Sequence, residues 1–441
     1  MTATLPAAPA TERVRSRAFV PALEGMRGMA ALGVLVTHVA FQTGAAGTPI
    51  IGRVWGRFDM AVAVFFALSG FLLWRPHAAA ARGLRSAPSV GYYLRHRAAR
   101  ILPAYWVVVC AVLVLLPSAA GTAGLRVWVS NLALLQVFVP LTLTDGLTQM
   151  WSLSVEVAFY LVLPVLAFAL VRLRGSAARL RVPVILALGV ISLGWNFIPV
   201  PTPDAIHADN WLPGYLPWFA AGMLLAELAD NSVRLSNWWK VAANQPLMWA
   251  VAALAFLLAA TDLAGPAGLT RAEPWQYVVK MGLGTIIGFA LLAPLVLRDP
   301  AARPHRWRLL AGRSKQHRWR LLAGRSKQHR WRLLAGRSKQ HRWRLLAGRS
   351  KQHRWLESPV AATIGRWSYG IFIWHLAVLS IVFPVFGILP FQGDFCYVLI
   401  LTVAITLPVA SASYALVEEP VRRWARGRDR TKQAPVIEPA S

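Results

Sequence analysis

The sequence predicts an all-α polytopic membrane protein with about ten transmembrane helices. The chain of 441 residues is 56% hydrophobic and only 15% charged, whereas a soluble domain carries about 25% charged residues. Its apolar residues also gather in long runs, and its mean hydropathy is +0.47. This composition cannot cover the surfaces of several water-exposed domains, so that class of protein is excluded.

Ten apolar runs approach the roughly 20 residues that cross a bilayer. Several of them are short, and we expect these to extend into their flanks. The runs are residues 24–44, 58–75, 101–118, 150–171, 182–198, 214–229, 247–262, 278–297, 360–384 and 396–418.

Arginine-rich segments predict the orientation, because short cytoplasmic loops are enriched in Lys and Arg. The N-terminal tail and the segments 75–100 and 172–181 all carry several arginines, which places them on the cytoplasmic side. This pattern requires that the run 128–140 does not cross, so we expect it to be re-entrant or interfacial. Both termini are then cytoplasmic.

A basic tandem repeat fills the segment 303–355. It consists of consecutive copies of HRWRLLAGRSKQ without any Asp or Glu, and it supplies much of the formal net charge of +29. It is either a cytoplasmic loop that lies on anionic lipid or a passive insertion tolerated in a loop. Charge alone specifies no sequence, so no nucleic-acid partner is expected. We assign residues 1–18 and 425–441 as cytoplasmic tails and 19–424 as the membrane domain that carries the repeat.

Other chemical signatures are missing from the sequence. Cys110 and Cys396 both lie in apolar runs, which argues against a disulfide framework or a thiolate metal cluster. A glycine-rich phosphate loop, an H-E-x-x-H zinc motif and a G-x-S-x-G nucleophile motif are not found. We therefore expect neither a metal site nor an ATP-driven pump.

The first apolar run carries two costly polar residues, Arg27 and His38. Such groups within a span usually mark function or a partner. Their separation is close to three helical turns, so they share a face about 16 Å apart along the axis. Taken separately, Arg27 is equally explained as an interfacial anchor and His38 as a helix-packing hydrogen bond. Their shared face, in a helix rich in Gly and Ala, favours a site.

Glu156, in QMWSLSVEVAFYLVLP, is the next costly residue. We expect it in the outer half of the membrane at a depth resembling that of His38, where a carboxylate can hold an imidazole in one tautomer. The alternative is a structural ion pair or a hydrogen bond to a Trp or Tyr. Arg97 and Arg100 lie at the cytoplasmic mouth of the third span, where they either bind phosphates or simply set the topology.

Two further polar positions lie within spans. Ser69 is followed by Gly70 in AVAVFFALSGFLLWRP, where small residues most often indicate tight helix packing. For His375, in SYGIFIWH, packing is also the favoured interpretation.

An ordered set of motifs resembles the bacterial acyltransferase 3 family of integral-membrane O-acyltransferases. The resemblance runs from about residue 19 to 424, and the combination is specific although no single motif is. Two positions depart from the family pattern, because Glu24 and Ala63 stand where the family often has Asp. The motifs are LEGMRG followed by a histidine, FFALSGFL, RAARILPAY, QMWSLSVEVAFYLVLP, SYGIFIWH and VEEP.

The resemblance implies a donor, a class of acceptor and a location. The donor is acyl-CoA, commonly acetyl-CoA, acting as a co-substrate and not as a permanently bound cofactor. The acceptor is a hydroxyl of a sugar, a cell-envelope glycan or a secondary metabolite such as a macrolide. The location is the bacterial inner (plasma) membrane. The family's essential Arg and His carry over to Arg27 and His38, and its R-x-x-R motif to Arg97 and Arg100. The candidate supporting residues are Glu24, Ser69, Tyr105, Trp151, Tyr160 and His375.

Together these observations predict a site with two levels. Arginines near the cytoplasm, namely Arg27, Arg97 and Arg100, bind the nucleotide end of acyl-CoA. Deeper in the membrane, His38 acts as general base on the acceptor hydroxyl, and Glu156 orients it. The sequence leaves open whether the acyl group first rests on His38.

Two other functions fit the composition. One is a transporter of an acylated or anionic solute, although the two halves of the chain lack matching interrupted segments. The other is a non-catalytic anchor whose basic loop recruits anionic partners. Deleting residues 305–352 separates an enzyme, which keeps its activity, from such an anchor. The acceptor, the acyl length, the side from which the acceptor arrives and the oligomeric state are not specified.

Overall fold

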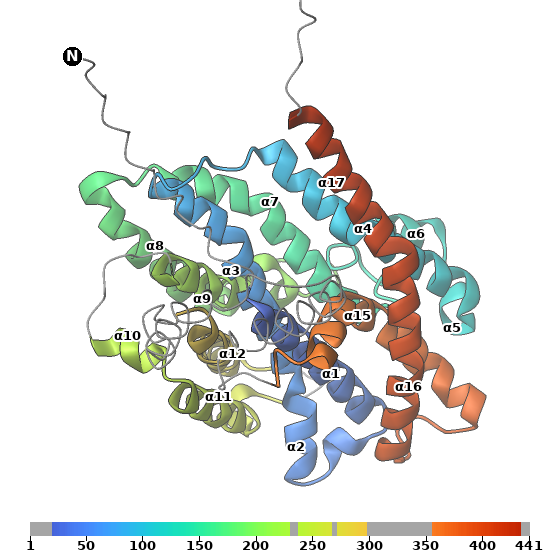
Figure 1. Cartoon of the computed structure of the whole chain (residues 1–441). Coiled ribbons are helices and arrows are strands. Elements are labelled where there is room, and N and C mark those ends of the chain that lie inside the picture. Colours follow the sequence, from blue (N-terminus) through green and yellow to red (C-terminus); the bar gives the residue numbers. More distant parts are fainter. Residues whose placement is uncertain (1–19, 230–236, 267–270, 298–354, 434–441) are drawn as a thin grey trace, which may run out of the picture.

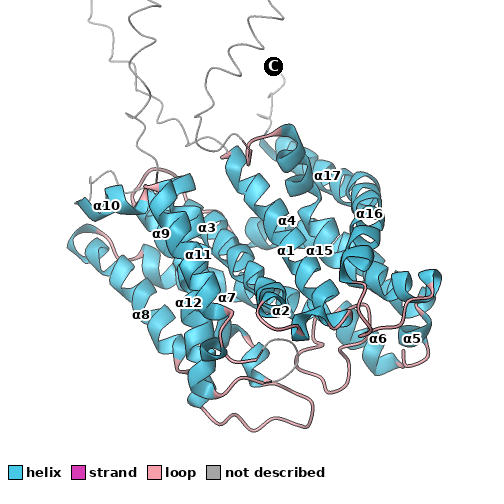
Figure 2. Cartoon of the chain, turned by 90° about the horizontal axis from the view of Figure 1, so that it is seen from below, coloured by secondary structure: helices cyan, strands magenta, loops and turns pink. Residues whose placement is uncertain are grey.

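The computed structural model describes residues 20–229, 237–266, 271–297 and 355–433. Within these ranges every regular element is a helix, which confirms the predicted all-α membrane fold (Figure 1). The long helices pack side by side in one bundle, as the second view shows (Figure 2). The first tail and nearly all of the tandem repeat lie outside the described residues, so the predicted domain boundaries stay predictions.

Each of the ten apolar runs corresponds to one long helix. Shorter helices connect them: α2 (Ile51–Gly56), α5 (Pro117–Ala120), α6 (Leu125–Leu132) and α10 (Asn237–Ala242). The ten are α1 (Pro21–Gln42), α3 (Ala61–Ala81), α4 (Val90–Leu115), α7 (Trp151–Val171), α8 (Arg181–Leu193), α9 (Leu212–Ala229), α11 (Gln245–Ala259), α12 (Pro274–Val296), α15 (Pro359–Phe386) and α16 (Phe395–Ser413).

Seven helical stretches of the described chain are long and apolar enough to cross a membrane. Helices α1, α9 and α11 fall outside that set. Arg27 and His38 lower the hydropathy of α1, and α11 has only 15 residues, or about 22 Å. A multi-pass membrane protein follows, while the count of ten spans and the cytoplasmic position of both termini stay predictions. The seven stretches are Ile51–Ala81, Val90–Leu115, Thr148–Val171, Gly175–Phe197, Pro274–Val296, Pro359–Phe386 and Phe395–Arg426.

Local sequence signals fix where the helices of the site begin and end. Proline occupies the first turn of α1 and of α15, where a missing N–H costs nothing. The side chains of Ser89 and Ser358 cap α4 and α15 by accepting backbone N–H bonds. Helix α15 ends at Gly387, whose positive φ of 67° suits glycine. These caps set the depth of the polar residues on each helix.

Helices α1 and α15 lie side by side, with their residues in parallel register. A Cβ at Gly28 would meet the backbone of Gly365, and ten residues further on both helices His38 meets His375. A side chain at Gly365 would in turn collide with the carbonyl oxygen of Glu24. Glycine therefore lets the two backbones touch, and this close contact sets the histidines opposite each other.

Helix α3 packs against α9 in the same way. A Cβ at Gly70 would collide with the carbonyl oxygen of Phe219, and one at Gly222 would collide with that of Ala67. Gly70 thus makes the tight helix packing that the sequence predicts. Its neighbour Ser69 does not pack against α9, because its hydroxyl donates to Glu156 on α7.

The segment 128–140 does not form a spanning helix. Helix α6 ends at Leu132 after 8 residues, about 12 Å, and the chain then turns back. Buried side chains satisfy the turning backbone: Asn131 Nδ2 donates to the carbonyl oxygens of Val127 and Thr142, and Tyr105 Oη donates to that of Asn131. Such irregular backbone is tolerated within a membrane protein only when it is satisfied by the protein itself.

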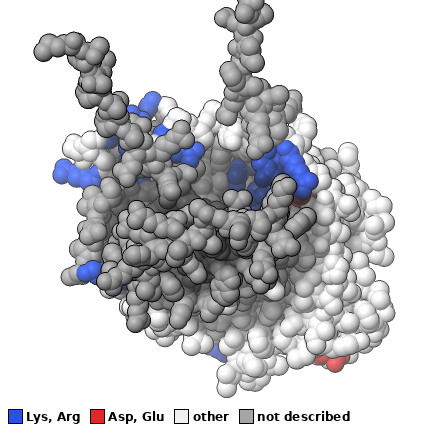
Figure 3. Space-filling view, viewed as in Figure 1, with Lys and Arg blue, Asp and Glu red and all other residues white. Residues whose placement is uncertain are grey.

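Charge is unevenly distributed over the surface. On the face in Figure 3, Lys and Arg gather where α17 (Glu419–Gln433) and the ends of α3 and α7 lie, while a broad side of the molecule is uncharged. Exposed apolar residues such as Val165, Val190 and Ile400 agree with a lipid-facing belt. The basic end is the one that the arginine-rich segments predict to be cytoplasmic.

Candidate active site

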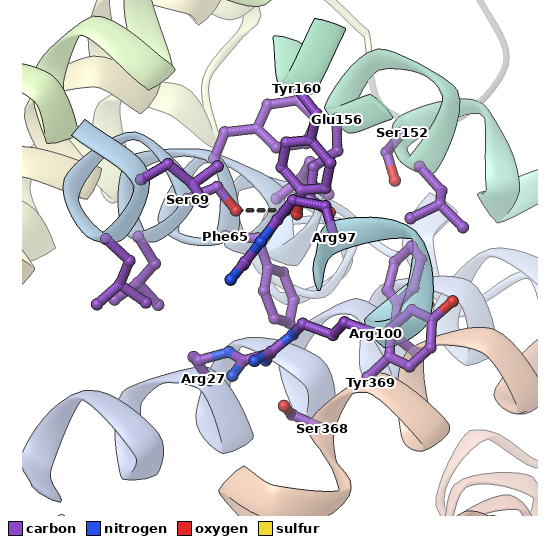
Figure 4. Close-up of a pocket in the computed structure, with 17 residues that line it drawn as sticks. Arg27, Phe65, Ser69, Arg97, Arg100, Ser152, Glu156, Tyr160, Ser368 and Tyr369 are labelled. Atoms are coloured by element: carbon purple, nitrogen blue, oxygen red, sulfur yellow. Dashed lines mark hydrogen bonds between the residues drawn. The ribbon is translucent and has the colours of Figure 1, made fainter. Parts of the chain in front are cut away.

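A pocket of about 80 Å³ lies between α1, α3, α4, α7 and α15 (Figure 4). Every arginine that the sequence singles out for the donor lines it, and so does Glu156. The lining residues are Arg27, Val62, Phe65, Phe66, Leu68, Ser69, Leu72, Leu73, Arg97, Arg100, Ser152, Leu153, Glu156, Tyr160, Ser368, Tyr369 and Phe372. Five helices that are distant in sequence therefore form one polar chamber inside an apolar bundle.

The guanidinium groups of the pocket lack partners. Within the described chain, Arg27, Arg97 and Arg100 form no ion pair or hydrogen bond, and Nε of Arg97 is buried without a hydrogen bond. Arg27 and Arg100 point toward one another (Figure 4), and the positive charge of Arg100 acts on Arg27. Like charges held together in an apolar bundle are costly unless an anion joins them. Glu24 and Glu156 act on Arg27 through their charges without pairing with it, so the guanidinium donors stay available to an anionic group.

Glu156 lies at the level of these arginines. Its Oε1 accepts hydrogen bonds from Ser69 Oγ and from Tyr160 Oη, the latter at 2.7 Å. The expected depth beside His38 is wrong, because Glu156 lines the arginine pocket and His38 does not. The expected contact between the two is also not formed, because the carboxylate is held by α3 and by its own helix α7.

His38 instead pairs with His375. Nδ1 of His38 lies 2.8 Å from the carbonyl oxygen of Val34 and 3.1 Å from Nε2 of His375. Nδ1 of His375 lies 2.7 Å from the carbonyl oxygen of Phe372. A carbonyl only accepts, so this network assigns the proton of each ring to Nδ1. Nε2 of His38 is then left with a free lone pair, as a general base requires.

The pocket and the histidine pair are adjacent along α15. Ser368 lines the pocket, and His375 lies seven residues later, about 10 Å along the axis. Phe372 lies between them: it lines the pocket, and its ring centroid is 6.0 Å from that of His375. Its ring also contacts Phe65 edge to face. On α1 the corresponding distance from Arg27 to His38 is about 16 Å. The two predicted levels exist, with two phenylalanines between them.

Three supporting candidates lie away from the pocket lining. Tyr105 donates to the backbone of the segment 128–140, so it braces that segment. Trp151 packs on Tyr215 with ring centroids 5.0 Å apart. Glu24 is partly buried at the α1–α15 contact, where its carbonyl oxygen faces Gly365. The structure thus brings Ser69, Tyr160 and His375 to the site and places these three in packing positions.

Ala63, where the family often has Asp, is fully buried in the structure. A Cβ at Gly288 on α12 would lie 3.1 Å from the carbonyl oxygen of Ala63, so α3 packs closely against α12 at this position. One turn earlier, Asp59 forms an ion pair of 2.9 Å with Lys280. Asp59 is thus held by an ion pair to α12 and does not line the arginine pocket.

Several polar groups near the site were not predicted from the sequence. Ser152, Ser368 and Tyr369 line the pocket, and Tyr369 Oη donates to the carbonyl oxygen of Ile101 at 2.9 Å. The signal was present in SYGIFIWH, because positions 368, 372 and 375 share one face of a helix. That spacing joins the pocket to the histidine pair.

Glu418, in the VEEP motif, was also missed. It closes a π-helix, Tyr414–Glu418, between α16 and α17, a distortion that is frequent at functional sites. The side chain is buried, and its Oε1 has no hydrogen bond within the described chain. Arg100, Arg422 and Arg27 are the charges that act on it. The π-helix therefore places the Glu418 carboxylate near the arginines of the pocket, although Glu418 does not line the pocket itself.

The chain belongs to the acyltransferase 3 family. The family model described as an acyltransferase domain matches residues 20–316, which include α1, α3, α4 and α7 of the site. The resemblance seen in the sequence motifs is thereby confirmed, and α15 is the one helix of the pocket that lies outside the matched residues.

Two curated relatives support this assignment. The acyltransferase MdmB of Streptomyces mycarofaciens is 36% identical over 164 residues, which cover 35% of this chain and 40% of the relative. The peptidoglycan O-acetyltransferase OatA of Listeria monocytogenes is 23% identical over 435 residues, which cover 92% of this chain and 56% of the relative. The matched parts span about half the length of these relatives. No solved structure matches the chain.

Proposed function

We propose that the chain transfers an acyl group, most simply acetyl, from acyl-CoA to a hydroxyl of a cell-envelope glycan, sugar or secondary metabolite in the bacterial inner membrane. The single observation that carries this proposal is the set of three unpaired arginines about one pantetheine length from a histidine with a free Nε2. The names of the relatives support an acyltransferase, and that of OatA supports a glycan acceptor.

Arg27, Arg97 and Arg100 bind the phosphates of the donor in this proposal. Acyl-CoA carries a pyrophosphate, which planar guanidinium groups bind with two parallel hydrogen bonds each. Binding would remove the repulsion between Arg27 and Arg100 at the same time. The pantetheine arm then extends past Phe65 and Phe372 toward His38, and the thioester arrives beside the imidazole.

His38 supplies the base. Its Nε2 takes the proton of the acceptor hydroxyl while the hydroxyl oxygen attacks the thioester carbonyl carbon. The new C–O bond forms, the C–S bond breaks, and the departing CoA thiolate takes the proton back from Nε2. His375 keeps Nδ1 of His38 protonated and stabilises the imidazolium through its own Nε2 lone pair, so His375 is a positioning residue.

Glu156 belongs to the donor level in this scheme. Its carboxylate is the one acidic group among the residues that line the pocket, and it holds Ser69 and Tyr160 in place. We propose that it sets the charge and shape of the pocket around the donor. This replaces the role of orienting His38.

Release of free CoA thiol from acetyl-CoA by the purified protein, measured with membrane extract as acceptor, tests the proposal. The wild-type chain should release thiol and acetylate the extract. His38→Ala and Arg27→Ala should each abolish both signals while the protein still inserts in the membrane, whereas Arg366→Gln on an exposed turn of α15 should behave as wild type. A transporter would release no thiol, and normal activity of His38→Ala would refute the mechanism.

A further inference from the structure

A second cavity, of about 500 Å³, lies one helical turn from the arginine pocket. It is built on the same three helices, α3, α4 and α7, at the end predicted to be cytoplasmic. Its lining residues are His77, Ala87, Pro88, Val90, Tyr93, Pro164, Ala167, Phe168, Val171, Arg172 and Arg174.

The relation between the two cavities is regular. On α4 the lining moves from Arg97 back to Tyr93, and on α7 it moves from Tyr160 on to Pro164. On α3 it moves from Leu73 to His77. Each step is four residues, about 6 Å along the helix, and all three steps run in the same direction. The second cavity is therefore the continuation of the first toward the basic end of the bundle.

The two cavities differ in chemistry. The second is lined mainly by apolar and aromatic side chains, and it contains a buried Tyr93 hydroxyl that has no hydrogen bond within the described residues. Its rim carries Arg172, whose guanidinium lies 3.6 Å from the ring centroid of Phe168, and Arg174. Its lining includes no Asp or Glu. A flat aromatic ring would fit its walls, and an anionic group would fit its rim.

We propose that this cavity binds the adenosine 3′-phosphate end of the acyl-CoA donor. The inference rests on the proposed function and extends it to a subsite. With the pyrophosphate on Arg27, Arg97 and Arg100, the adenosine lies one turn away on the cytoplasmic side, while the pantetheine arm runs in the opposite direction to His38. The adenine ring packs against Tyr93 and Phe168, and the 3′-phosphate binds Arg174.

Truncated donors separate the two cavities. Binding of CoA, 3′-dephospho-CoA and 4′-phosphopantetheine to the purified full chain in detergent is measured by isothermal titration calorimetry. Phosphopantetheine retains the group for the arginine pocket but lacks adenosine. The wild-type protein should bind CoA at least tenfold more tightly than phosphopantetheine, since the contacts of one ring and one phosphate are each worth about a factor of ten.

Two variants locate the subsite, and a third serves as the control. Arg174→Gln should weaken CoA about tenfold and leave 3′-dephospho-CoA unchanged. Phe168→Ala, at an exposed position that tolerates truncation, should weaken both of these ligands and leave phosphopantetheine unchanged. Arg179→Gln is the matched control. Arg179 lies five residues after Arg174, is exposed like it, and does not line the cavity.

Two results would overturn the inference. If the wild type, Arg174→Gln and Phe168→Ala bind CoA with equal affinity, this cavity is not the adenosine subsite. That result is expected if the cavity holds a lipid chain, and it leaves the proposed acyl-CoA donor unaffected. Failure of the wild type to bind CoA at all would reject the donor itself together with its subsite.

Discussion

Nε2 of His375 lies 3.1 Å from Nδ1 of His38, although the two residues are 337 positions apart in the chain. Each ring is also tied to a carbonyl oxygen of its own helix. The pair therefore has one internally consistent proton arrangement, in which Nε2 of His38 is unprotonated. This arrangement supports the positioning role proposed for His375, which its motif alone did not indicate.

His375→Ala should lower the rate of acyl transfer 10- to 100-fold, since the base loses the group that orients it. The affinity for CoA should stay within twofold of wild type, because His375 lies outside the arginine pocket. His375→Gln, whose side-chain oxygen can still accept from His38, should recover part of kcat. Steady-state kinetics with acetyl-CoA, together with calorimetry of CoA binding, measure the two effects. An equal loss in the Ala and Gln variants would show that His375 only fills space.

Glu156→Gln tests the corrected position of the carboxylate. The amide oxygen still accepts from Ser69 and Tyr160, but the pocket gains one net positive charge. CoA affinity should therefore hold or rise by a few-fold, and acyl transfer should fall at least tenfold because the pocket no longer holds the bound donor in the productive position. Calorimetry and thiol release on the same preparation provide both values. A loss of CoA binding would contradict this charge argument, and unchanged transfer would remove Glu156 from the machinery.

Glu418→Gln should weaken CoA binding about fivefold to tenfold. Glu418 attracts Arg100 from behind the pocket, and its loss lets that guanidinium move out of position. The adjacent Glu419 is a matched control, because it pairs with Arg423 on the exposed side of α17, so Glu419→Gln should bind CoA normally. If the carboxylate acted merely as a repulsive charge near an anion, Glu418→Gln would bind CoA more tightly, which is the opposite sign.

Gly365→Ala should disrupt the α1–α15 contact. The new methyl collides with the carbonyl oxygen of Glu24, so the helices separate and His38 moves away from His375. We expect a loss of thermal stability of about 2 kcal/mol and acyl transfer reduced at least tenfold. Gly282→Ala on α12 is the control, since a Cβ there meets no atom within 4 Å. Thermal unfolding followed by tryptophan fluorescence, with thiol release in parallel, decides the outcome. Wild-type behaviour of both variants would show that the register is not needed.

Much of this architecture is determined by the sequence alone. Apolar runs of near-membrane length specify the long helices because each span must satisfy its own backbone, and costly polar residues within them identify Arg27, His38, Arg97, Arg100 and Glu156. Charge patterning also shows why the segment 128–140 does not cross. The ordered motifs give the family, which the family model confirms.

Only the tertiary structure decided which of these residues meet. Depth along a helix is predictable from residue spacing, but the rotation and register of one helix against another depend on close packing at Gly28, Gly70 and Gly365. Contacts between helices gave Glu156 to Ser69 and His38 to His375, whereas Tyr160 meets Glu156 within α7. The π-helix that turns Glu418 inward likewise has no periodic signal. Residue spacing determines where along its own helix a polar group lies, whereas contacts between helices choose its partner.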